Sequence, residues 1–252
     1  MKFLDLKDIS ERYMDLLNPT SPEKLLKAGQ IAGMKPGDRV IDFGCGFAEP
    51  LILWADEFGI SGVGIDFRPY ACERATKKIA ERGLSGRLSI ECGDAAAYNP
   101  APHSFDLASC IGATFIWSDF AHAVRAMKVA IKPQGKLVIG EAHWLTDNVP
   151  DEFRTAQTEI TTEAELLRMA REEGYDFEYV LHSNHDEWDR YEADNWVGLL
   201  RWIEANPGHP ERQQVIDHLH ESQAEYTRYG YKYFGWAIYI LTPVTYYLAG
   251  KS

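Results

Sequence analysis

The sequence lacks the features that mark membrane-spanning and secreted proteins. It contains no apolar run of roughly 18 residues, and acidic residues appear early in its N-terminal segment MKFLDLKDIS, where a signal peptide would be apolar. Its four cysteines, Cys45, Cys72, Cys92 and Cys110, are scattered without the C-x-x-C or His-paired spacing of disulfide and zinc frameworks. We therefore expect a cytoplasmic protein with no membrane partner and no metal site.

Basic residues are also scarce. The 26 Lys and Arg residues are outnumbered by 38 Asp and Glu residues, and the formal net charge is -12. Proteins bind phosphate backbones through clustered Lys and Arg side chains, because these release the counterions that the backbone holds. The charge balance therefore opposes a nucleic-acid partner. With 45% hydrophobic residues, a chain of 252 residues can nevertheless bury a full core.

What the sequence does contain is an alternation of short apolar runs with amphipathic stretches. Runs typical of buried strands occupy residues 39–43, 62–66, 87–91, 105–111 and 135–141. Helical periodicity fills the intervals at residues 48–58, 69–82 and 119–131. Strands that alternate with helices of this length form right-handed crossovers around a parallel sheet. The sequence thus predicts a doubly wound α/β domain.

Helical segments flank this alternation on both sides. Two short helices, split at NPTSPEK, are expected within residues 8–33. After the alternation we expect a helix at 161–173, a strand at 175–183, helices at 186–205 and 210–229, and a last strand at 235–243. We predict a single domain over residues 1–252, made of an N-terminal helical lid (1–33), a ligand-binding core (34–145) and a C-terminal half (146–252) with a helical insertion (183–232) that caps the sheet.

The first predicted strand runs into a glycine-rich loop, VIDFGCGFAEP (residues 40–50). Gly44 and Gly46 have no Cβ, so a ligand can approach the loop backbone closely. Asp66 ends the second predicted strand 20 residues beyond Gly46, a separation at which an acid can accept hydrogen bonds from both hydroxyls of a ribose. The structural alternatives are a simple tight turn for the loop and a helix N-cap for Asp66.

Two acidic residues distinguish this loop from the fingerprint of dinucleotide dehydrogenases. Glu49 stands where the fingerprint has its third glycine, and a carboxylate there would face the pyrophosphate of NAD. Asp42 suits a ligand that carries a cation, such as the α-amino group of a methionine. After the third predicted strand, Asp94 can accept from an adenine amino group, while Ala95 leaves room for the ring. The three acids together outline an amine, a ribose and an adenine.

In these motifs the chain resembles the class I S-adenosylmethionine-dependent methyltransferases over residues 36–145. The motifs are DFGCGFA, GIDFRP, GDAA, FDLASCIGA and IKPQGKLVIGE; Ala48 departs from the family, many of whose members have a third glycine there. The resemblance implies a Rossmann-like, seven-stranded sheet whose reversed last strand, GWAIYILTP, lies beside the fifth. It implies S-adenosylmethionine as cofactor, with these contacts: Asp42, Gly44, Cys45 and Gly46 around the methionine, Asp66 at the ribose, Phe67, Asp94 and Ala95 at the adenine, and Ile111 along the cleft.

The expected methyl acceptor is a small molecule. The stretches WDRYEADNW, RWIEANP and FGWAIYIL resemble a bacterial subfamily of small-molecule methyltransferases. The segment after the fourth strand, CIGATFIW, lacks the acid or Asn, the paired prolines and the aromatic residue of enzymes that methylate amino groups of nucleic acids. Cys110 follows Ser109 rather than a proline, so we expect it to pack in the core and not to attack a pyrimidine.

Glu141 and His143 are the predicted catalytic residues, because two-residue alternation places both on one side of the fifth strand near its carboxyl end. The alternative is that Glu141 pairs at the strand end and His143 is a solvated loop residue. Trp117 and Trp144 follow the fourth and fifth strands and are predicted to form a wall of the acceptor pocket.

Tyr13 and Asn18, beside the break between the N-terminal helices, are predicted to lie close to the cofactor and its acceptor. His182 and His185 lie among acids and are expected in a solvated turn. Two other classes of function stay open at this point. A non-catalytic S-adenosylmethionine-binding regulatory module would have no acceptor-sized cavity beside the cofactor, and an NAD-dependent oxidoreductase is opposed by Asp42 and Glu49.

Overall fold

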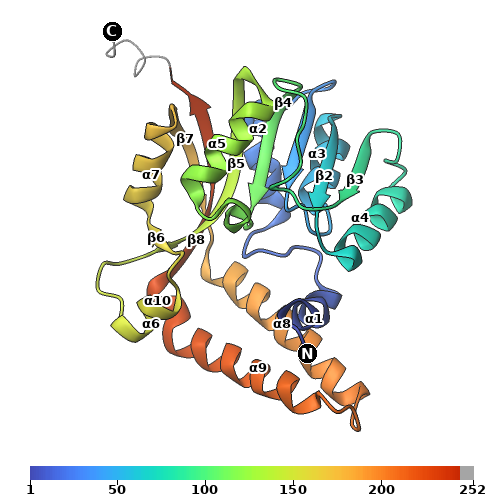
Figure 1. The fold of residues 1–252 in the computed structure, drawn as a ribbon, viewed down its shortest axis with the longest axis vertical. Coiled ribbons are helices and arrows are strands. Elements are labelled where there is room, and N and C mark those ends of the chain that lie inside the picture. The colour runs from blue at the N-terminus through green and yellow to red at the C-terminus, as the bar shows by residue number, and fades with distance from the viewer. Residues whose placement is uncertain (245–252) are drawn as a thin grey trace.

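The computed structural model describes residues 1–244, which fold around one mixed sheet (Figure 1). In these residues the sheet has eight strands in the order β3-β2-β1-β4-β5-β8-β7, with β6 paired to β5 beside this path. Their bounds are β1 Arg39–Phe43, β2 Ser61–Asp66, β3 Leu88–Cys92, β4 Phe105–Ile111, β5 Ile131–Trp144, β6 Thr161–Thr162, β7 Tyr175–His182 and β8 Phe234–Pro243. Only β8 runs antiparallel to its neighbours, β5 and β7. The predicted reversed strand beside the fifth is confirmed.

Helices cover both faces of the sheet. One face packs against α2 (Pro22–Ala32), α3 (Glu49–Phe58) and α4 (Pro69–Glu81), and the other against α5 (Phe120–Ala130) and α7 (Glu163–Glu172). The central strands β1 and β4 are therefore buried on both sides, which explains why their sequences are continuous apolar runs. The doubly wound α/β fold predicted from the sequence is confirmed.

The other helical segments of residues 1–244 are α1 Phe3–Ser10, η1 Glu11–Tyr13, η2 Thr114–Trp117, α6 Asp151–Ala156, α8 His185–Ala205, α9 Arg212–Glu225, the π turn η3 Tyr226–Gly230 and α10 Tyr231–Tyr233. Among them, α1, α8 and α9 lie together beyond the carboxyl ends of the strands (Figure 1). A Cβ at Gly198 of α8 would lie 2.2 Å from the Ser10 carbonyl oxygen, so the contact between α1 and α8 requires glycine there. No helix of the described chain has the length and apolarity to cross a bilayer.

Some predicted boundaries were wrong, because strand pairing extends further than the local sequence pattern. β5 occupies residues 131–144 rather than 135–141, since it pairs with β4 from Ile131 and with β8 as far as Trp144. The helix expected at 161–173 begins at Glu163, because the two residues before it pair with the end of β5. The helix expected at 210–229 ends at Glu225 and continues as the π turn.

Candidate active site

The glycine-rich loop between β1 and α3 is held in shape by the end of β2. The Gly44 amide donates to the Ile65 carbonyl (2.8 Å), and the Gly46 amide donates to Oδ2 of Asp66 (2.9 Å). Gly44 has φ +69°, and a Cβ at this position would lie 2.4 Å from Cβ of Ala113. The loop therefore requires glycine at position 44, both for its backbone angle and for the close approach of the segment after β4.

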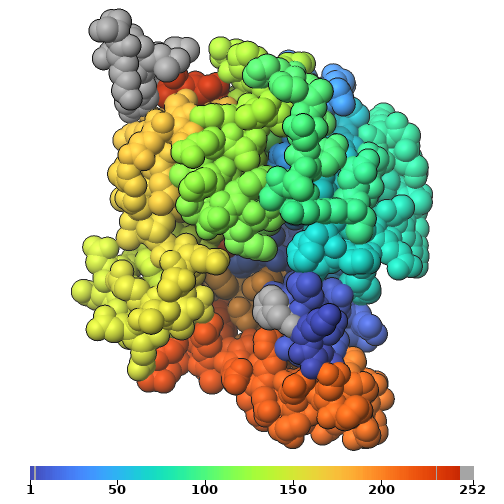
Figure 2. All heavy atoms as spheres, viewed as in Figure 1, coloured from blue at the N-terminus to red at the C-terminus, as the bar shows by residue number. Residues whose placement is uncertain are grey.

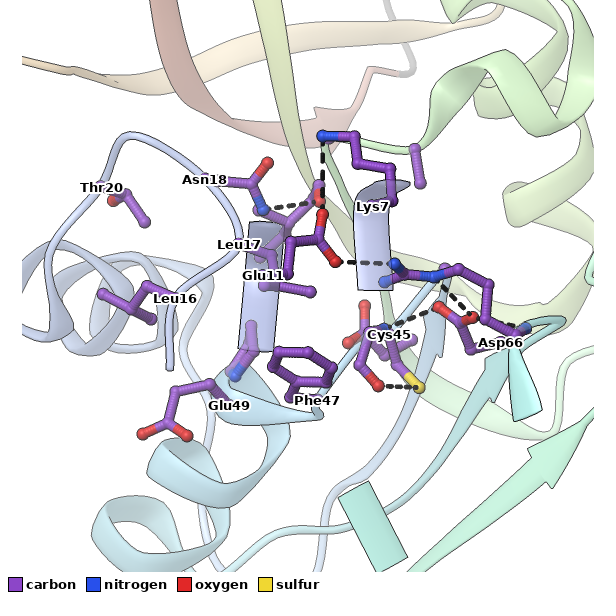
Figure 3. A pocket seen from close by; sticks show the side chains of 18 of the residues that line it. Lys7, Glu11, Leu16, Leu17, Asn18, Thr20, Cys45, Phe47, Glu49 and Asp66 are labelled. Atoms are coloured by element: carbon purple, nitrogen blue, oxygen red, sulfur yellow. Dashed lines mark hydrogen bonds and ion pairs between the residues drawn. The ribbon is translucent and has the colours of Figure 1, made fainter. Parts of the chain in front are cut away.

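A cavity of about 240 Å³ opens where this loop meets the ends of β2 and β4 (Figure 3). Most of the residues predicted to bind the cofactor line it: Asp42, Gly44, Cys45, Gly46, Asp66, Phe67 and Ile111. Because the carboxyl ends of parallel strands meet at one edge of a sheet, residues far apart in the chain share this space. We refer to it as the cofactor cavity.

Asp94 and Ala95 lie outside the lining of the cofactor cavity, in the loop after β3. The Gly93 amide donates to the Asp66 backbone carbonyl (2.9 Å), which holds this loop against the end of β2. The Asp94 carboxylate accepts from the Ala96 amide (2.9 Å). Both residues thus lie at the same edge of the sheet as the cavity, and their contact with an adenine stays a prediction.

Asp42 is a buried carboxyl group in the wall of the cofactor cavity, with 1% of its surface exposed. Burial raises its pKa to about 7, although the hydrogen bond from the Ser109 hydroxyl to Oδ1 (2.7 Å) lowers it. The folded protein therefore holds this proton more tightly than the unfolded chain, and stability falls as the pH rises from the ordinary aspartate range towards 7. A cation bound beside Asp42 offsets that loss, so the site fits the amino group of a methionine moiety.

Asp66 ends β2 with its carboxylate fixed by two backbone amides. Oδ2 accepts from Gly46 and Oδ1 accepts from Arg68, both at 2.9 Å. An ionised carboxylate has about four acceptor sites, so two remain for the hydroxyl groups of a ligand. The alternative role as a helix N-cap is wrong, because the N-cap position of α4 is Arg68, whose side chain makes no cap hydrogen bond.

The N-terminal segment covers the cofactor cavity. Lys7 and Glu11 line it from α1 and η1, together with Tyr191 of α8. An Nη1 atom of Arg68 lies 2.6 Å from Oε2 of Glu11, and Nε of the same arginine lies 3.7 Å from Oδ1 of Asp66. Sequence reasoning missed Lys7, Glu11 and Arg68, although the arginine in GIDFRP, two residues after the predicted ribose acid, was an available signal.

The two N-terminal residues predicted from the sequence have different surroundings. Asn18 lines the cofactor cavity and donates from Nδ2 to the Ile111 carbonyl (3.0 Å). Tyr13 is 51% exposed and lies outside the lining, with the Arg201 guanidinium 4.4 Å from its ring centroid. The structure therefore brings Asn18 to the cavity and places the Tyr13 ring against a side chain of α8.

A second cavity, of about 700 Å³, adjoins the first, because Gly112 and Phe115 line both. Its walls come from η2, the start of α5, the end of β5 and the segment between α6 and α7. Its polar lining includes Thr114, Asp119, Glu141, Gln157, Glu159 and Thr161. In Figure 2 the surface is hollowed between the N-terminal segment and the chain around residues 150–165. The residues between α6 and α7 carried no motif, so sequence reasoning missed them.

Glu141 is half-buried in the wall of the second cavity. Its carboxylate accepts hydrogen bonds from the Thr114 hydroxyl and from the Ala142 amide (3.0 Å). Burial raises its pKa, although both hydrogen bonds lower it. A carboxylate whose pKa is raised is a stronger base than an exposed one, so Glu141 is suited to accept a proton from a molecule in this cavity.

His143 lies outside the lining of both cavities. It is 2% exposed on β5, and its Nδ1 lies 3.0 Å from the Tyr239 hydroxyl, so the alternative of a solvated loop residue is wrong. Burial lowers the pKa of its imidazole. The predicted alternation of Glu141 and His143 on one strand is observed, but only the first of them lines the second cavity.

The predicted tryptophan wall does not line the two cavities. Trp117 packs edge-on against Phe43, with ring centroids 5.1 Å apart. Trp144 is buried and stacks on Phe234 at 5.4 Å. The aromatic residue shared by the two cavities is Phe115, which is 57% exposed.

Cys110 has no exposed surface, and burial raises the pKa of its thiol well above the usual value. Nucleophilic cysteines need an accessible thiolate. The structure therefore agrees with the expectation that Cys110 packs in the core.

The chain is similar to known methyltransferases. Residues 40–135 match the methyltransferase domain family. Over 238 residues the chain is 34% identical to the uncharacterized protein YjhP of Escherichia coli (strain K12), covering 92% of this chain and 96% of that protein. The crystal structure of an S-adenosylmethionine-dependent methyltransferase from Thiobacillus denitrificans, in complex with S-adenosyl-L-homocysteine, superposes with a TM-score of 0.89 at 30% identity and covers 96% of this chain and 100% of that one. The 27-O-demethylrifamycin SV methyltransferase of Amycolatopsis mediterranei is 24% identical over 216 residues, which cover 79% of this chain and 73% of that protein.

The fold, the acids around the glycine loop and these similarities place the chain in the family of class I S-adenosylmethionine-dependent methyltransferases. It is a methyltransferase, and its cofactor is S-adenosylmethionine. The buried carboxyl group of Asp42 and the glycine required at position 44 fit that cofactor. Neither an NAD-dependent oxidoreductase nor a non-catalytic binding module describes this chain.

Proposed function

We propose that the enzyme methylates a small molecule that binds in the second cavity. The observation that carries this proposal is the wall that the two cavities share at Gly112 and Phe115. Transfer of a methyl group from a sulfonium is an in-line displacement, which requires the acceptor to lie against the methyl group with water excluded. The relative named 27-O-demethylrifamycin SV methyltransferase supports an acceptor of this class.

Within this proposal, S-adenosylmethionine supplies the methyl group when bound. Asp42 and Asp66 hold its amino group and its ribose, and Asn18 and Ile111 line the cleft beside it. Glu141 accepts the proton that a hydroxyl or ammonium acceptor loses. The polar side chains of the second cavity position the acceptor, and Phe115 packs against it.

The proposal predicts where the methyl label goes. Incubation with methyl-labelled S-adenosylmethionine and a pool of small metabolites should give a labelled product of low molecular mass, identified by mass spectrometry. Parallel reactions with total protein and total RNA should give no label above background. Labelling of a macromolecule, or no transfer to any small molecule by a protein that binds S-adenosylhomocysteine, would refute a small-molecule acceptor.

We also propose that residues 1–33 and the insertion 183–232 form a lid over the cofactor. The cofactor cavity, at about 240 Å³, is below the roughly 300–1,000 Å³ usual for ligand sites. The ion pair between Glu11 and Arg68 stands beside Asp66, so the N-terminal segment has to move to admit a ligand.

Amide hydrogen exchange measures this movement. S-adenosylhomocysteine should increase protection in the loops at residues 44–48, 66–70 and 94–98, and also in residues 10–22. Residues 124–130 of α5, which line neither cavity and lie outside the proposed lid, serve as an internal reference whose exchange should not change. Protection of the three loops without residues 10–22 would contradict the lid and leave the cofactor site intact.

A further inference from the structure

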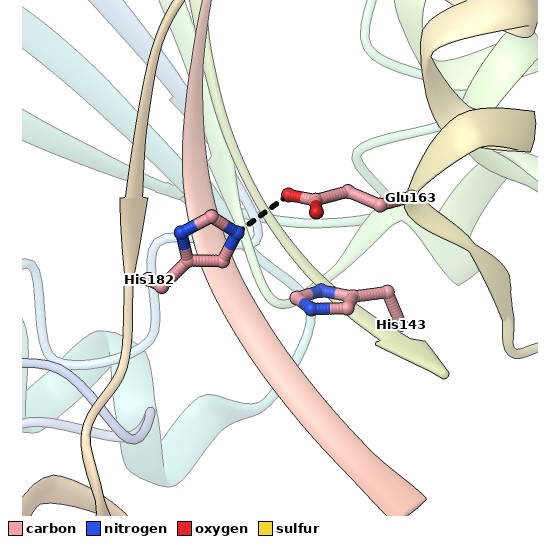
Figure 4. Close-up of side chains that lie close together, drawn as sticks. All are labelled: His143, Glu163 and His182. Atoms are coloured by element: carbon pink, nitrogen blue, oxygen red, sulfur yellow. Dashed lines mark hydrogen bonds and ion pairs between the residues drawn. The ribbon is translucent and has the colours of Figure 1, made fainter. Parts of the chain in front are cut away.

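His143, Glu163 and His182 converge outside both cavities, although they come from three separate elements (Figure 4). His143 lies near the end of β5, Glu163 is the first residue of α7 and His182 is the last residue of β7. One potential ligand atom of each residue lies within 4.8 Å of those of the other two. Nε2 of His182 lies 2.7 Å from Oε1 of Glu163. Neither the predicted solvated turn for His182 nor methyl transfer accounts for this cluster.

We propose that these three side chains form a binding site for a divalent transition metal of the zinc class. Two imidazole nitrogens and one carboxylate oxygen are a ligand set that zinc uses in proteins, whereas magnesium and calcium prefer oxygen ligands. Ligand atoms around a tetrahedral zinc ion lie roughly 3.3 Å apart, given bonds of roughly 2 Å. Side-chain rotations are therefore enough to close the cluster around an ion, with the fourth position left to water.

The surroundings of the cluster suit such a site. His143 is held in place: a Cβ on Gly235 would lie 2.2 Å from its Nε2, and the Tyr239 hydroxyl lies 3.0 Å from its Nδ1. The side chains of His182 and Glu163 are 54% and 36% exposed. An ion can therefore reach the cluster from solvent, and the two exposed ligands can adjust to it while the buried one stays fixed.

A metal at this position links three parts of the fold. Within residues 1–244, β7 is the last strand in the order of the sheet and is paired to β8 alone. α8, the first helix of the insertion, begins three residues after His182. A bound ion ties this edge to β5 and to the start of α7, so it stabilises the base of the insertion. Without the ion, the same residues form the hydrogen bond between His182 and Glu163.

Zinc titration of the chelator-treated full chain tests the site. Calorimetry with zinc chloride should show one equivalent bound, and zinc should raise the melting temperature. His182→Ala removes a ligand and Glu163→Gln replaces an anionic ligand by a neutral amide, so each should weaken zinc binding by at least about tenfold, the cost of losing even an outer-shell partner. The variants remove the exposed ligands and leave the buried His143 in place. His220→Ala, which removes an exposed histidine of α9, is the matched control and should bind zinc as the wild type does.

Affinity for S-adenosylhomocysteine reports folding in each variant and should stay at the wild-type value. Under that condition, weaker zinc binding in both ligand variants supports the site. If the wild type binds no zinc, the three residues form only a hydrogen-bonded pair beside a buried histidine, and the proposal is overturned. It is equally overturned if both ligand variants bind zinc with wild-type affinity, since the metal then lies elsewhere.

Discussion

Glu141→Gln should lower kcat about 100-fold at saturating cofactor and acceptor, the usual scale for loss of a general base. Glu141 lines the second cavity, and its hydrogen bonds from Thr114 and Ala142 orient the carboxylate. Glutamine keeps one oxygen to accept from the Ala142 amide, its NH2 group can donate to the Thr114 hydroxyl, and it cannot take a proton. The measurement is the initial rate of transfer to the acceptor identified in the label screen.

The pH profile provides a second readout of the same role. Burial raises the pKa of Glu141, so the base becomes protonated, and kcat falls, as the pH drops through that raised value. The Gln variant should lack this fall. Because the folded state disfavours the ionised carboxylate, the variant should be at least as stable as the wild type above that pKa. Asp42, whose pKa is about 7, also titrates in this range. Both pH profiles are therefore measured at saturating cofactor, so that titration of Asp42 does not change kcat.

Glu159→Gln is the matched control, since Glu159 lines the same cavity and the substitution changes the charge equally. At a pH above the Glu141 pKa, which Glu159 helps to raise, it should leave kcat within about twofold and change only KM, because only one carboxylate transfers the proton. A Glu141→Gln variant with normal kcat and a raised KM would show that Glu141 binds the acceptor and is not the base.

Asp66→Ala should weaken binding of S-adenosylhomocysteine by about 1.5 to 3 kcal/mol, or roughly 10- to 150-fold in Kd, the scale of charge-assisted hydrogen bonds. The same carboxylate also accepts from the amides of Gly46 and Arg68, so its loss leaves backbone donors unpaired. The free protein should therefore also lose about 1 to 3 kcal/mol of stability.

Two further variants separate binding from stability. Asp66→Asn keeps an oxygen that can accept an amide hydrogen bond, so it should recover part of the stability but not the affinity. Asp56→Ala removes an acid from the solvent side of α3 and should change neither the affinity for S-adenosylhomocysteine nor the melting temperature. Calorimetry and thermal unfolding give both quantities. If Asp66→Asn binds the ligand as tightly as the wild type, the role of Asp66 is structural.

Local sequence pattern was sufficient for the core of the fold and for most of the cofactor site. Apolar runs define the buried strands, and in a parallel sheet their carboxyl ends meet at one edge. Asp42, Gly46 and Asp66 could therefore be placed together from their positions at strand ends alone. Gly44 was also predicted from its place in the loop. The structure supplies the reason for glycine there, because the positive φ and the nearby Ala113 side chain leave no room for a Cβ.

The side chains that complete the sites depend on contacts that no local pattern encodes. The ion pair between Glu11 and Arg68 joins residues 57 positions apart, and it exists because α1 packs on α8 beside the glycine loop. Strand alternation placed Glu141 and His143 on one side of β5. It could not show that Gly235 on β8 leaves room for the His143 ring, which turns towards Glu163 and His182. Periodicity reports the face on which a side chain lies, whereas its partners depend on which distant segments pack against that face, and that is decided only in the folded chain.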